Sequence, residues 1–458
     1  MTEEKRALVV GLAKSGIPAV KALNQLGYAV DLNDLKTSEA FENILPTLAG
    51  CYRDTLFGRH PEVEKISGYD LILVSPGVPM DLPFIAAAKS AGVEIIGELE
   101  LGFRLAKGKF FAITGTNGKT TTTALTGEIF KAAGRHAIVA GNIGQSVVEL
   151  ASISTDETNW ITEVSSFQLE TVQAFHPSIS AILNVTPDHL NRHKTMENYT
   201  DAKCRIFENA DADDVVLLNA DNPDTFALIE RAAKTGARVA LFSRKTEVED
   251  GVYCDPASGE LILVDASRGL KESLMNHREI FIPGSHNLEN ALAAAGISYF
   301  AGIQPEVIAS ALKSFQGVEH RIEFVREINS VYYYNDSKGT NPDASIKAVE
   351  AMTRPTVLIA GGMDKGSTFD ELIEAFGGRI IKLIVLGETA ALIEETAQKL
   401  GFNNVARVAT MDEAVVLAAD CAPEGGAVLL SPACASWDMY ENFERRGEHF
   451  KRCVNELR

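Results

Sequence analysis

Residues 110–121 have the sequence Phe-Phe-Ala-Ile-Thr-Gly-Thr-Asn-Gly-Lys-Thr-Thr, and this stretch decides how the centre of the chain folds. An apolar run is followed by two glycines, a lysine and a threonine, and then by helix-forming residues such as Ala124 and Leu125. This order predicts a buried strand, a tight loop and a helix N-terminus, an arrangement in which backbone N–H groups and the helix dipole hold phosphate groups. We therefore predict a nucleotide site of the P-loop type, with ATP as its ligand.

Two side chains of this loop have predicted roles. Lys119 would reach the terminal phosphates, and the Thr120 hydroxyl would bind Mg²⁺. The common phosphate loop has a longer gap between its glycines than the Thr116-Asn117 pair found here, so an ordinary glycine-rich turn is the alternative. A Gly-Lys-Thr sequence after a buried strand favours nucleotide binding. The predicted contacts with ATP in this loop are Gly115, Thr116, Asn117, Gly118, Lys119, Thr120 and Thr121.

Length and composition are typical of an enzyme of several domains. At 458 residues the chain is long enough for about three domains. Its 43 basic and 62 acidic residues give a net charge of −19, which argues against a nucleic acid or an anionic membrane as a partner. The six cysteines show no Cys-x-x-Cys spacing, and neither a signal peptide nor an apolar run of membrane-spanning length is visible. The composition therefore predicts a cytoplasmic protein with reduced thiols and no membrane insertion.

Short β-rich runs that end in small polar residues alternate with amphipathic helical stretches along the chain. Apolar strands between helices indicate parallel sheets covered on both faces, and ligands bind such sheets at the carboxyl ends of the strands. We predict an α/β protein of three domains: a Rossmann-like domain over 1–107, a central P-loop-type ATPase domain with a mostly parallel sheet over 108–314, and a Rossmann-like domain over 315–458. The central segment also has a polar, β-prone stretch between Arg244 and Pro283. The predicted strands include Ala7–Leu12, Asp70–Val74, Phe110–Thr114, Ile179–Val185, Val215–Asn219, Val357–Ala360, Leu383–Leu386 and Val428–Ser431.

A second glycine-rich turn, Gly11-Leu-Ala-Lys-Ser-Gly16, follows the first predicted strand. Asp34 lies about twenty residues further on, as in a dinucleotide fingerprint. Ala13 replaces the middle glycine that lets the backbone approach a pyrophosphate, so NAD is disfavoured. A different nucleotide diphosphate held by Ser15 and Asp34 is the preferred interpretation, and a purely structural turn is the alternative.

Three polar residues after the phosphate loop are candidate metal ligands. Glu163 follows an apolar strand, where a helix cap is the common role, but a phosphate loop in the same domain favours Mg²⁺, which prefers oxygen ligands. His189 follows Asp188 at the end of a strand on the same sheet edge, although a lone histidine is more often structural. Lys203 lies in a helical pattern that by itself indicates a surface lysine.

Taken together, motifs along the whole chain resemble the Mur ligases of bacterial cell-wall synthesis. They are Gly115-Thr-Asn-Gly-Lys-Thr120, Glu163-Val-Ser-Ser-Phe-Gln168, Asn184-Val-Thr-Pro-Asp-His189, Ala202-Lys203, Gly284-Ser-His-Asn287 with Asn290, and His320-Arg321. Within the family, Asn335-Asp-Ser-Lys-Gly-Thr-Asn341 and Ser431-Pro-Ala-Cys-Ala-Ser436 followed by Asn442-Phe443 resemble the members that add D-glutamate to UDP-N-acetylmuramoyl-L-alanine. The short phosphate loop is the family's own form. Trp437 and Lys14 depart from the aliphatic residues expected there, which affects the expected substrate affinity and not the expected reaction.

The resemblance implies an ATP-dependent ligase that works through an acyl phosphate. It implies a UDP-substrate-binding domain over 1–107, a central ATP-binding domain over 108–314 and a D-glutamate-binding domain over 315–458, in a chain that we expect to be monomeric. Two Mg²⁺ sites are implied, with Thr120 and Glu163 at one, and His189 and a carbamylated Lys203 at the other. The implied catalytic residues are Lys119, His189 and Lys203.

The resemblance also implies ligand contacts outside the phosphate loop. ATP would contact Asn287, Asn290, Arg321 and, through its ribose, Asp336. The muramoyl-alanine portion would contact Asn142, Ser165 and Gln168, and the UDP portion Ser15, Asp34, Lys36 and Gly77. The D-glutamate contacts would be Thr340, Lys365, Ser436, Trp437 and Phe443. The local sequence also supports this role for Lys365. Gly361-Gly-Met-Asp follows a predicted buried strand and would let the lysine project at the sheet edge to bind a carboxylate.

Two other classes of function are alternatives. One is a related amide-forming enzyme, such as another Mur ligase or a folylpolyglutamate synthase, against which the motifs of the C-terminal third argue. The other is a nucleotide-binding protein without catalysis, in which the metal ligands Glu163, His189 and Lys203 would be unnecessary.

Overall fold

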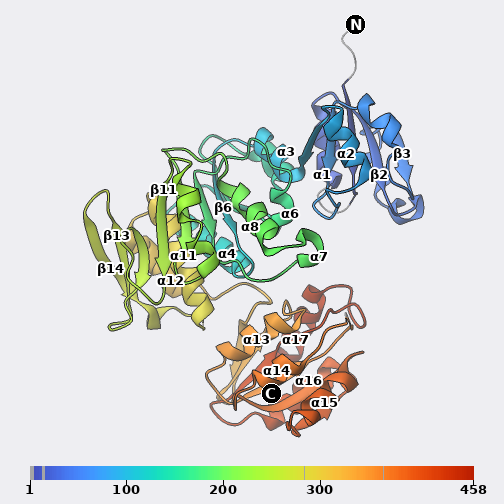
Figure 1. Ribbon diagram of the computed structural model, residues 1–458. Helices are drawn as coiled ribbons and strands as arrows, with labels where there is room; N and C mark the ends of the chain where they lie inside the picture. Colours follow the sequence, from blue (N-terminus) through green and yellow to red (C-terminus); the bar gives the residue numbers. More distant parts are fainter. Residues whose placement is uncertain (1–4, 13–15, 283, 365, 458) are drawn as a thin grey trace. The chain divides into compact units, whose positions relative to one another are not determined.

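The computed structural model describes residues 5–12, 16–282, 284–364 and 366–457. The described residues form three β-sheets flanked by helices, which confirms the predicted α/β class (Figure 1). The chain divides into two compact units, one made of the residues up to 277 together with 289–311, the other of 278–288 and 312–458. The predicted boundaries at 107/108 and 314/315 stay predictions. Ser15, Lys365 and Lys14 lie outside the described residues.

The first sheet belongs to the N-terminal part of the first unit. Its five strands are parallel, in the order β3-β2-β1-β4-β5, and apolar side chains of the strands pack on both faces of the sheet. Its strands are β1 (Arg6–Val10), β2 (Ala29–Asp34), β3 (Asp54–Phe57), β4 (Leu71–Val74) and β5 (Glu94–Gly97). The α-helices of this part are α1 (Gly16–Gln25), α2 (Pro83–Ser90) and α3 (Glu98–Leu105).

The second sheet has nine strands in the order β14-β13-β12-β11-β10-β9-β6-β8-β7. It is parallel from β7 to β12, and the last two strands are antiparallel. The stretch predicted to be β-prone does form strands, and their antiparallel pairing was not predicted. Its strands are β6 (Lys109–Thr114), β7 (Ala137–Gly141), β8 (Asn159–Glu163), β9 (Ile179–Ile182), β10 (Val215–Asn219), β11 (Arg238–Ser243), β12 (Gly251–Cys254), β13 (Glu260–Asp265) and β14 (Leu270–Asn276). The α-helices that follow along the chain are α4 (Lys119–Ala132), α5 (Val147–Leu150), α6 (Ser166–Leu169), α7 (Leu190–His193), α8 (Met196–Cys204), α9 (Pro223–Phe226), α10 (Ile229–Ala233), α11 (Ser285–Phe300) and α12 (Pro305–Ser314).

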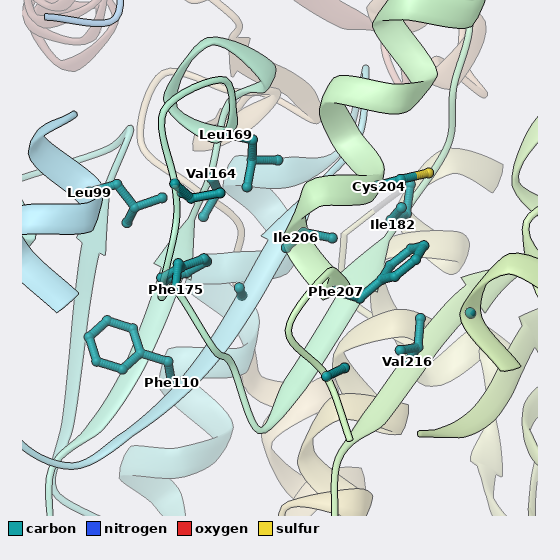
Figure 2. Packing of buried hydrophobic residues seen from close by; sticks show 14 of the residues in the cluster. Leu99, Phe110, Val164, Leu169, Phe175, Ile182, Cys204, Ile206, Phe207 and Val216 are labelled. Carbon is teal, nitrogen blue, oxygen red and sulfur yellow. The ribbon is translucent and has the colours of Figure 1, made fainter. Parts of the chain in front are cut away.

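Aromatic side chains fill the core beside β6 and fix the strand that leads into the phosphate loop. Phe110 stacks on Trp160 with ring centroids 5.5 Å apart and meets Phe175 edge-on at 5.9 Å. Figure 2 shows Phe110, Phe175 and Phe207 with the aliphatic residues around them. Burying aromatic rings of this size contributes a large share of core stability, so these contacts anchor β6 in the core.

The third sheet lies in the second unit and has six strands in the order β15-β16-β20-β17-β18-β19. Every pair in it is parallel except β15–β16. Its strands are β15 (Glu323–Ile328), β16 (Val331–Asn335), β17 (Thr356–Ala360), β18 (Ile380–Val385), β19 (Val405–Arg407) and β20 (Ala427–Leu430). The helices are α13 (Pro342–Ala351), α14 (Asp370–Glu374), α15 (Ala390–Lys399), α16 (Met411–Cys421) and α17 (Phe443–Glu456).

All eight strands named from the sequence are present, with ends that differ by a few residues. Among the helices of the described ranges, none is both long enough and apolar enough to cross a membrane.

Candidate active site at the phosphate loop

The loop between β6 and α4 has the backbone geometry expected of a phosphate loop. Gly118 caps α4 with a φ of 86°, a left-handed conformation that favours glycine. A Cβ atom on Gly118 would lie 2.3 Å from Oδ1 of Asn290, so this close approach also requires glycine. Asn290 is buried and its Oδ1 accepts a hydrogen bond from the Thr122 hydroxyl at 3.3 Å. The predicted ATP contact Asn290 therefore lies directly against the loop.

Asn184 holds the loop from the side of β9, a role that the sequence predictions missed. Its Oδ1 accepts the N–H of Asn117 at 2.8 Å, and its Nδ2 donates to the Asn117 carbonyl at 3.1 Å. The Thr116 hydroxyl donates to the carbonyl of Thr186 at 3.2 Å. Asn184 opens the Asn-Val-Thr-Pro-Asp-His motif, so its position after a strand was the signal that could have indicated it.

The side-chain nitrogens of two lysines donate hydrogen bonds to one carbonyl of the loop. Lys119 Nζ donates to the carbonyls of Gly115 at 2.8 Å and Thr116 at 2.9 Å. Lys203 Nζ donates to the same Gly115 carbonyl at 2.9 Å. Lys203 is buried, with 1% of its surface exposed, so its interpretation as a surface lysine is wrong. Burial, and then the charge of Lys119, lower the pKa of Lys203 well below its ordinary value.

Tyr199 lies between the loop and two of the candidate ligands. Lys203 Nζ is 4.4 Å from the centre of its ring, and the His189 ring centroid is 6.4 Å away. Its hydroxyl is 3.2 Å from that of Thr116. Tyr199 is one helical turn before Lys203 in α8, and this spacing could have indicated it from the sequence. The structure therefore gathers His189 and Lys203 around one buried ring.

Glu163 has one carboxylate oxygen that the surrounding protein leaves without a hydrogen bond. It ends β8 and is buried; its Oε1 accepts from Nδ2 of Asn142 at 2.8 Å. Its Oε2 is buried and, within the described residues, has no hydrogen-bond partner. An unpaired buried carboxylate oxygen costs free energy, which a divalent cation bound there would recover. Glu163 therefore fits the predicted Mg²⁺ ligand, whereas the side chain of Asn142, a predicted substrate contact, is bonded to Glu163.

His189 lies in the loop after β9, because that strand ends at Ile182. It caps α7 with a φ of 52° and is 47% exposed, with Nε2 3.5 Å from Oδ2 of Asp188. Its ring centroid is 4.9 Å from that of Phe167. The expectation that His189 ends a strand is wrong, and its contact with a metal stays a prediction.

Ser165 and Gln168 form a capping box at the start of α6. The Ser165 hydroxyl accepts the N–H of Gln168 at 3.3 Å, and Gln168 Oε1 accepts the N–H of Ser165 at 3.0 Å. Gln168 Nε2 donates to the buried Glu98 at 3.4 Å. Their predicted contact with the muramoyl-alanine portion stays a prediction.

The carboxyl edge of the first sheet carries the predicted UDP contacts. Asp34 ends β2, and its two oxygens accept the N–H groups of Leu12 at 2.8 Å and Lys36 at 3.0 Å. Lys36 and Gly77 are exposed at turns after β2 and β4. Asp34 thus binds the backbone of Leu12, and its contact with a ligand stays a prediction.

In the second unit, Asp336 is buried at the end of β16. Its Oδ1 accepts the N–H of Ile322 at 3.2 Å and its Oδ2 the hydroxyl of Ser431 at 2.6 Å. Burial is the main cause that raises the pKa of Asp336 to about 7. Its carboxylate therefore joins two loops, and the predicted contact with the ribose stays a prediction. Arg321 is half-buried one residue before Ile322, and Asn287 is buried near the start of α11.

Of the predicted D-glutamate contacts, Thr340, Ser436 and Trp437 lie on loops that follow strands of the sheet in the second unit. Ser436 is buried after β20, and Thr340 is half-buried between β16 and α13. Phe443 is the first residue of α17, and its carbonyl accepts the hydroxyl of Ser337 at 2.8 Å. Trp437 is 65% exposed. The contacts of these residues with D-glutamate stay predictions.

Comparison with known proteins gives matches over nearly the whole chain. Residues 5–97 match the Mur ligase MurD-like N-terminal domain, 113–298 the Mur ligase middle domain, and 320–434 the Mur ligase glutamate ligase domain. The UDP-N-acetylmuramoylalanine--D-glutamate ligase of Alkaliphilus oremlandii is 51% identical, covering 100% of this chain and 99% of that protein. The enzyme of the same name from Clostridioides difficile is 49% identical, covering 99% of each.

Solved structures of Mur ligases have a fold similar to that of this chain. The UDP-N-acetylmuramate-alanine ligase MurC of Thermotoga maritima has a TM-score of 0.57 at 20% identity, covering 98% of this chain and 99% of that one. MurF of Acinetobacter baumannii has a TM-score of 0.59 at 17% identity, covering 97% and 93%. These structures support the fold, and the relatives at about half identity decide the family: this chain belongs to the Mur ligases.

Proposed function

We propose that the protein is an ATP-dependent ligase that joins D-glutamate to UDP-N-acetylmuramoyl-L-alanine in the synthesis of peptidoglycan precursors. The substrates follow from the names of relatives that match the chain over its full length. The chemistry rests on one structural observation: the phosphate loop has a buried lysine, Lys203, bonded to its Gly115 carbonyl. The unpaired Glu163 oxygen is a second support.

A carboxylate and an amine do not condense at neutral pH, so the acid must first be activated. Attack of the muramoyl-alanine carboxylate on the γ-phosphate of ATP would give an acyl phosphate and ADP. The D-glutamate amine would then attack the acyl carbon and expel phosphate. Two anions approach each other in the first step, so charge neutralisation and positioning dominate catalysis.

The residues of the loop can supply that neutralisation. Lys119 would leave the Gly115 and Thr116 carbonyls to bind the β- and γ-phosphates. Thr120 and Glu163 would hold one Mg²⁺, which supplies a Lewis acid that neutralises phosphate charge. Lys203 has the depressed pKa that carbamylation requires, because an uncharged amine is the form that adds CO₂. Carbamylated Lys203 and His189 would hold a second Mg²⁺.

The remaining predicted contacts complete this proposal. UDP would be held by Asp34, Lys36, Gly77 and Ser15, and the muramoyl-alanine portion by Asn142, Ser165 and Gln168. ATP would be held by Asn287, Asn290, Arg321 and Asp336. D-Glutamate would be held by Thr340, Ser436, Phe443, Trp437 and Lys365. The domains 1–107, 108–314 and 315–458 would bind the UDP substrate, ATP and D-glutamate, respectively.

Purified protein with ATP, Mg²⁺ and UDP-N-acetylmuramoyl-L-alanine tests the proposal against a panel of amino acids. Phosphate release and amide formation should require D-glutamate, and L-glutamate, D-aspartate, L-alanine and diaminopimelate should not replace it. Oxygen-18 in the substrate carboxylate should appear in the released phosphate. Turnover with another amino acid would indicate a different Mur ligase, and unlabelled phosphate would exclude the acyl phosphate.

A further inference from the structure

Three side chains without a role in the proposed reaction converge between α16 and α17. Asp412 lies in the first turn of α16, and His449 and Cys453 lie one helical turn apart on α17. Nε2 of His449 is 3.1 Å from Oδ2 of Asp412, and Sγ of Cys453 is 3.6 Å from Oδ1 of Asp412. The three groups offer ligand atoms that all lie within 4.8 Å of one another.

These separations are those of ligands around a tetrahedral transition metal. With a metal–sulfur bond of about 2.3 Å and bonds to nitrogen and oxygen of about 2.0 Å, neighbouring ligand atoms are about 3.3–3.6 Å apart. Nε2 of His449 and Oδ2 of Asp412, 3.1 Å apart, need a shift of only about 0.2 Å to reach this range, and Sγ of Cys453 lies 3.6 Å from the other carboxylate oxygen, Oδ1. The two helices therefore bring a carboxylate, an imidazole and a thiol within reach of a single ion, with their ligand atoms within 4.8 Å of one another.

The His449 ring provides a second, independent observation. Its Nδ1 is 2.9 Å from the hydroxyl of Tyr440. Its Nε2 is buried and makes no hydrogen bond with any described residue, although Oδ2 of Asp412 is 3.1 Å away. If Nδ1 carries the proton and donates to Tyr440, the Nε2 lone pair faces the Asp412 carboxylate, and a cation between them would stabilise this arrangement. A hydrogen bond at the far ring nitrogen is also the usual support of a metal-binding histidine.

Two other groups of acidic and histidine side chains do not share these properties. Nε2 of His176 is 2.5 Å from Oδ2 of Asp214, which is hydrogen-bond distance. In the group that contains His320, Oε2 of Glu323 accepts hydrogen bonds from the His320 N–H and from Nδ2 of Asn335, both at 2.9 Å. The candidate ligand atoms named in these two groups therefore already have hydrogen-bond partners within the protein.

We propose that Asp412, His449 and Cys453 bind one divalent transition metal of the zinc class, with water as the fourth ligand. A carboxylate, an imidazole and a thiolate together select zinc or cobalt over Mg²⁺ and Ca²⁺, which prefer oxygen ligands alone. Cys453 binds as the thiolate, so its S–H proton, which points to Asp412 in the metal-free protein, is released to solvent. The bound ion cross-links α16 to α17 and, through His449 and Tyr440, fixes the loop between β20 and α17.

Cobalt is the probe for this site, because a Co²⁺–thiolate bond gives a near-ultraviolet charge-transfer absorption that oxygen and nitrogen ligands do not give. The full-length protein is titrated with Co²⁺ in excess Mg²⁺, and one equivalent should produce the band. Zn²⁺ should then abolish it, and Zn²⁺ alone should raise the melting temperature. No thiolate band in the wild-type protein would overturn the proposal.

Variants assign the band to these residues. Cys453→Ser and His449→Gln should each weaken cobalt binding at least about tenfold, and the serine variant should lose the band altogether. Cys421→Ser, at the other end of α16, is the matched control and should behave as the wild type. His449→Gln keeps the thiol and provides the second measurement if the serine variant fails to fold. A band that persists unchanged in Cys453→Ser, or that disappears in Cys421→Ser alone, would contradict the assignment.

Discussion

Replacing Asp336 by asparagine should stabilise the second unit, and the gain should grow as the pH rises. The carboxylate is buried and accepts hydrogen bonds from Ile322 and Ser431. Asparagine has nearly the same shape: its Oδ1 can accept from Ile322 while its Nδ2 donates to the Ser431 oxygen. The substitution therefore removes a buried negative charge and keeps both contacts, so its effect on the free energy of unfolding reports the cost of that charge.

The direction and the size of the change in the free energy of unfolding follow from the pKa of Asp336, which burial raises from 3.8 to about 7. Between these values the folded protein binds more protons at this site than the unfolded chain does, so the free energy of unfolding falls as the pH rises. The contribution of the protonated Asp336 side chain to the free energy of unfolding is fully present below about pH 4 and is lost above about pH 7. The slope is about 1.4 kcal/mol per pH unit, which gives a total loss of about 4 kcal/mol.

Urea denaturation of the wild type and of Asp336→Asn, without nucleotide, measures this cost. The advantage of the variant should widen by about 2–3 kcal/mol between about pH 5 and about pH 8. Asp420→Asn, at an exposed position of α16, is the control and should show no such widening. A difference between Asp336→Asn and wild type that stays constant over this range would refute the reasoning.

Other predictions concern the active site. Lys203→Ala should be nearly inactive and partly rescued by acetate, which can supply the missing oxygen ligand; wild-type turnover of the unrescued variant would contradict its role. Gly118→Ala should raise the KM for ATP at least about tenfold and leave that for D-glutamate unchanged, because a left-handed backbone alone costs about 1–2 kcal/mol and the new Cβ would lie 2.3 Å from Asn290 Oδ1. Lys365→Ala should weaken D-glutamate use roughly ten- to 150-fold, since a charge-assisted hydrogen bond contributes about 1.5–3 kcal/mol. Equal losses for all three substrates would mean that Lys365 supports the fold.

Several features of this protein follow from contiguous sequence. The buried strand, the short glycine loop and the helix at 110–121 are present because each depends on neighbouring residues, apolar content and the conformational freedom of glycine. The parallel sheets follow in the same way from apolar strands separated by helices. Glu163 was predicted correctly at the end of a buried strand, because the carboxyl ends of parallel strands share one edge.

Only the tertiary structure decided how the side chains of the site are held. Lys203 has the sequence pattern of a surface lysine, yet the carbonyl that it contacts is 88 residues away in the chain. Tyr199 and Asn184 reach the same loop from separate segments. Burial sets the pKa values of Lys203 and Asp336, and it depends on residues distant in the sequence that fold over them. The local sequence therefore determines which groups can react, and the packing of remote segments determines their charge and position.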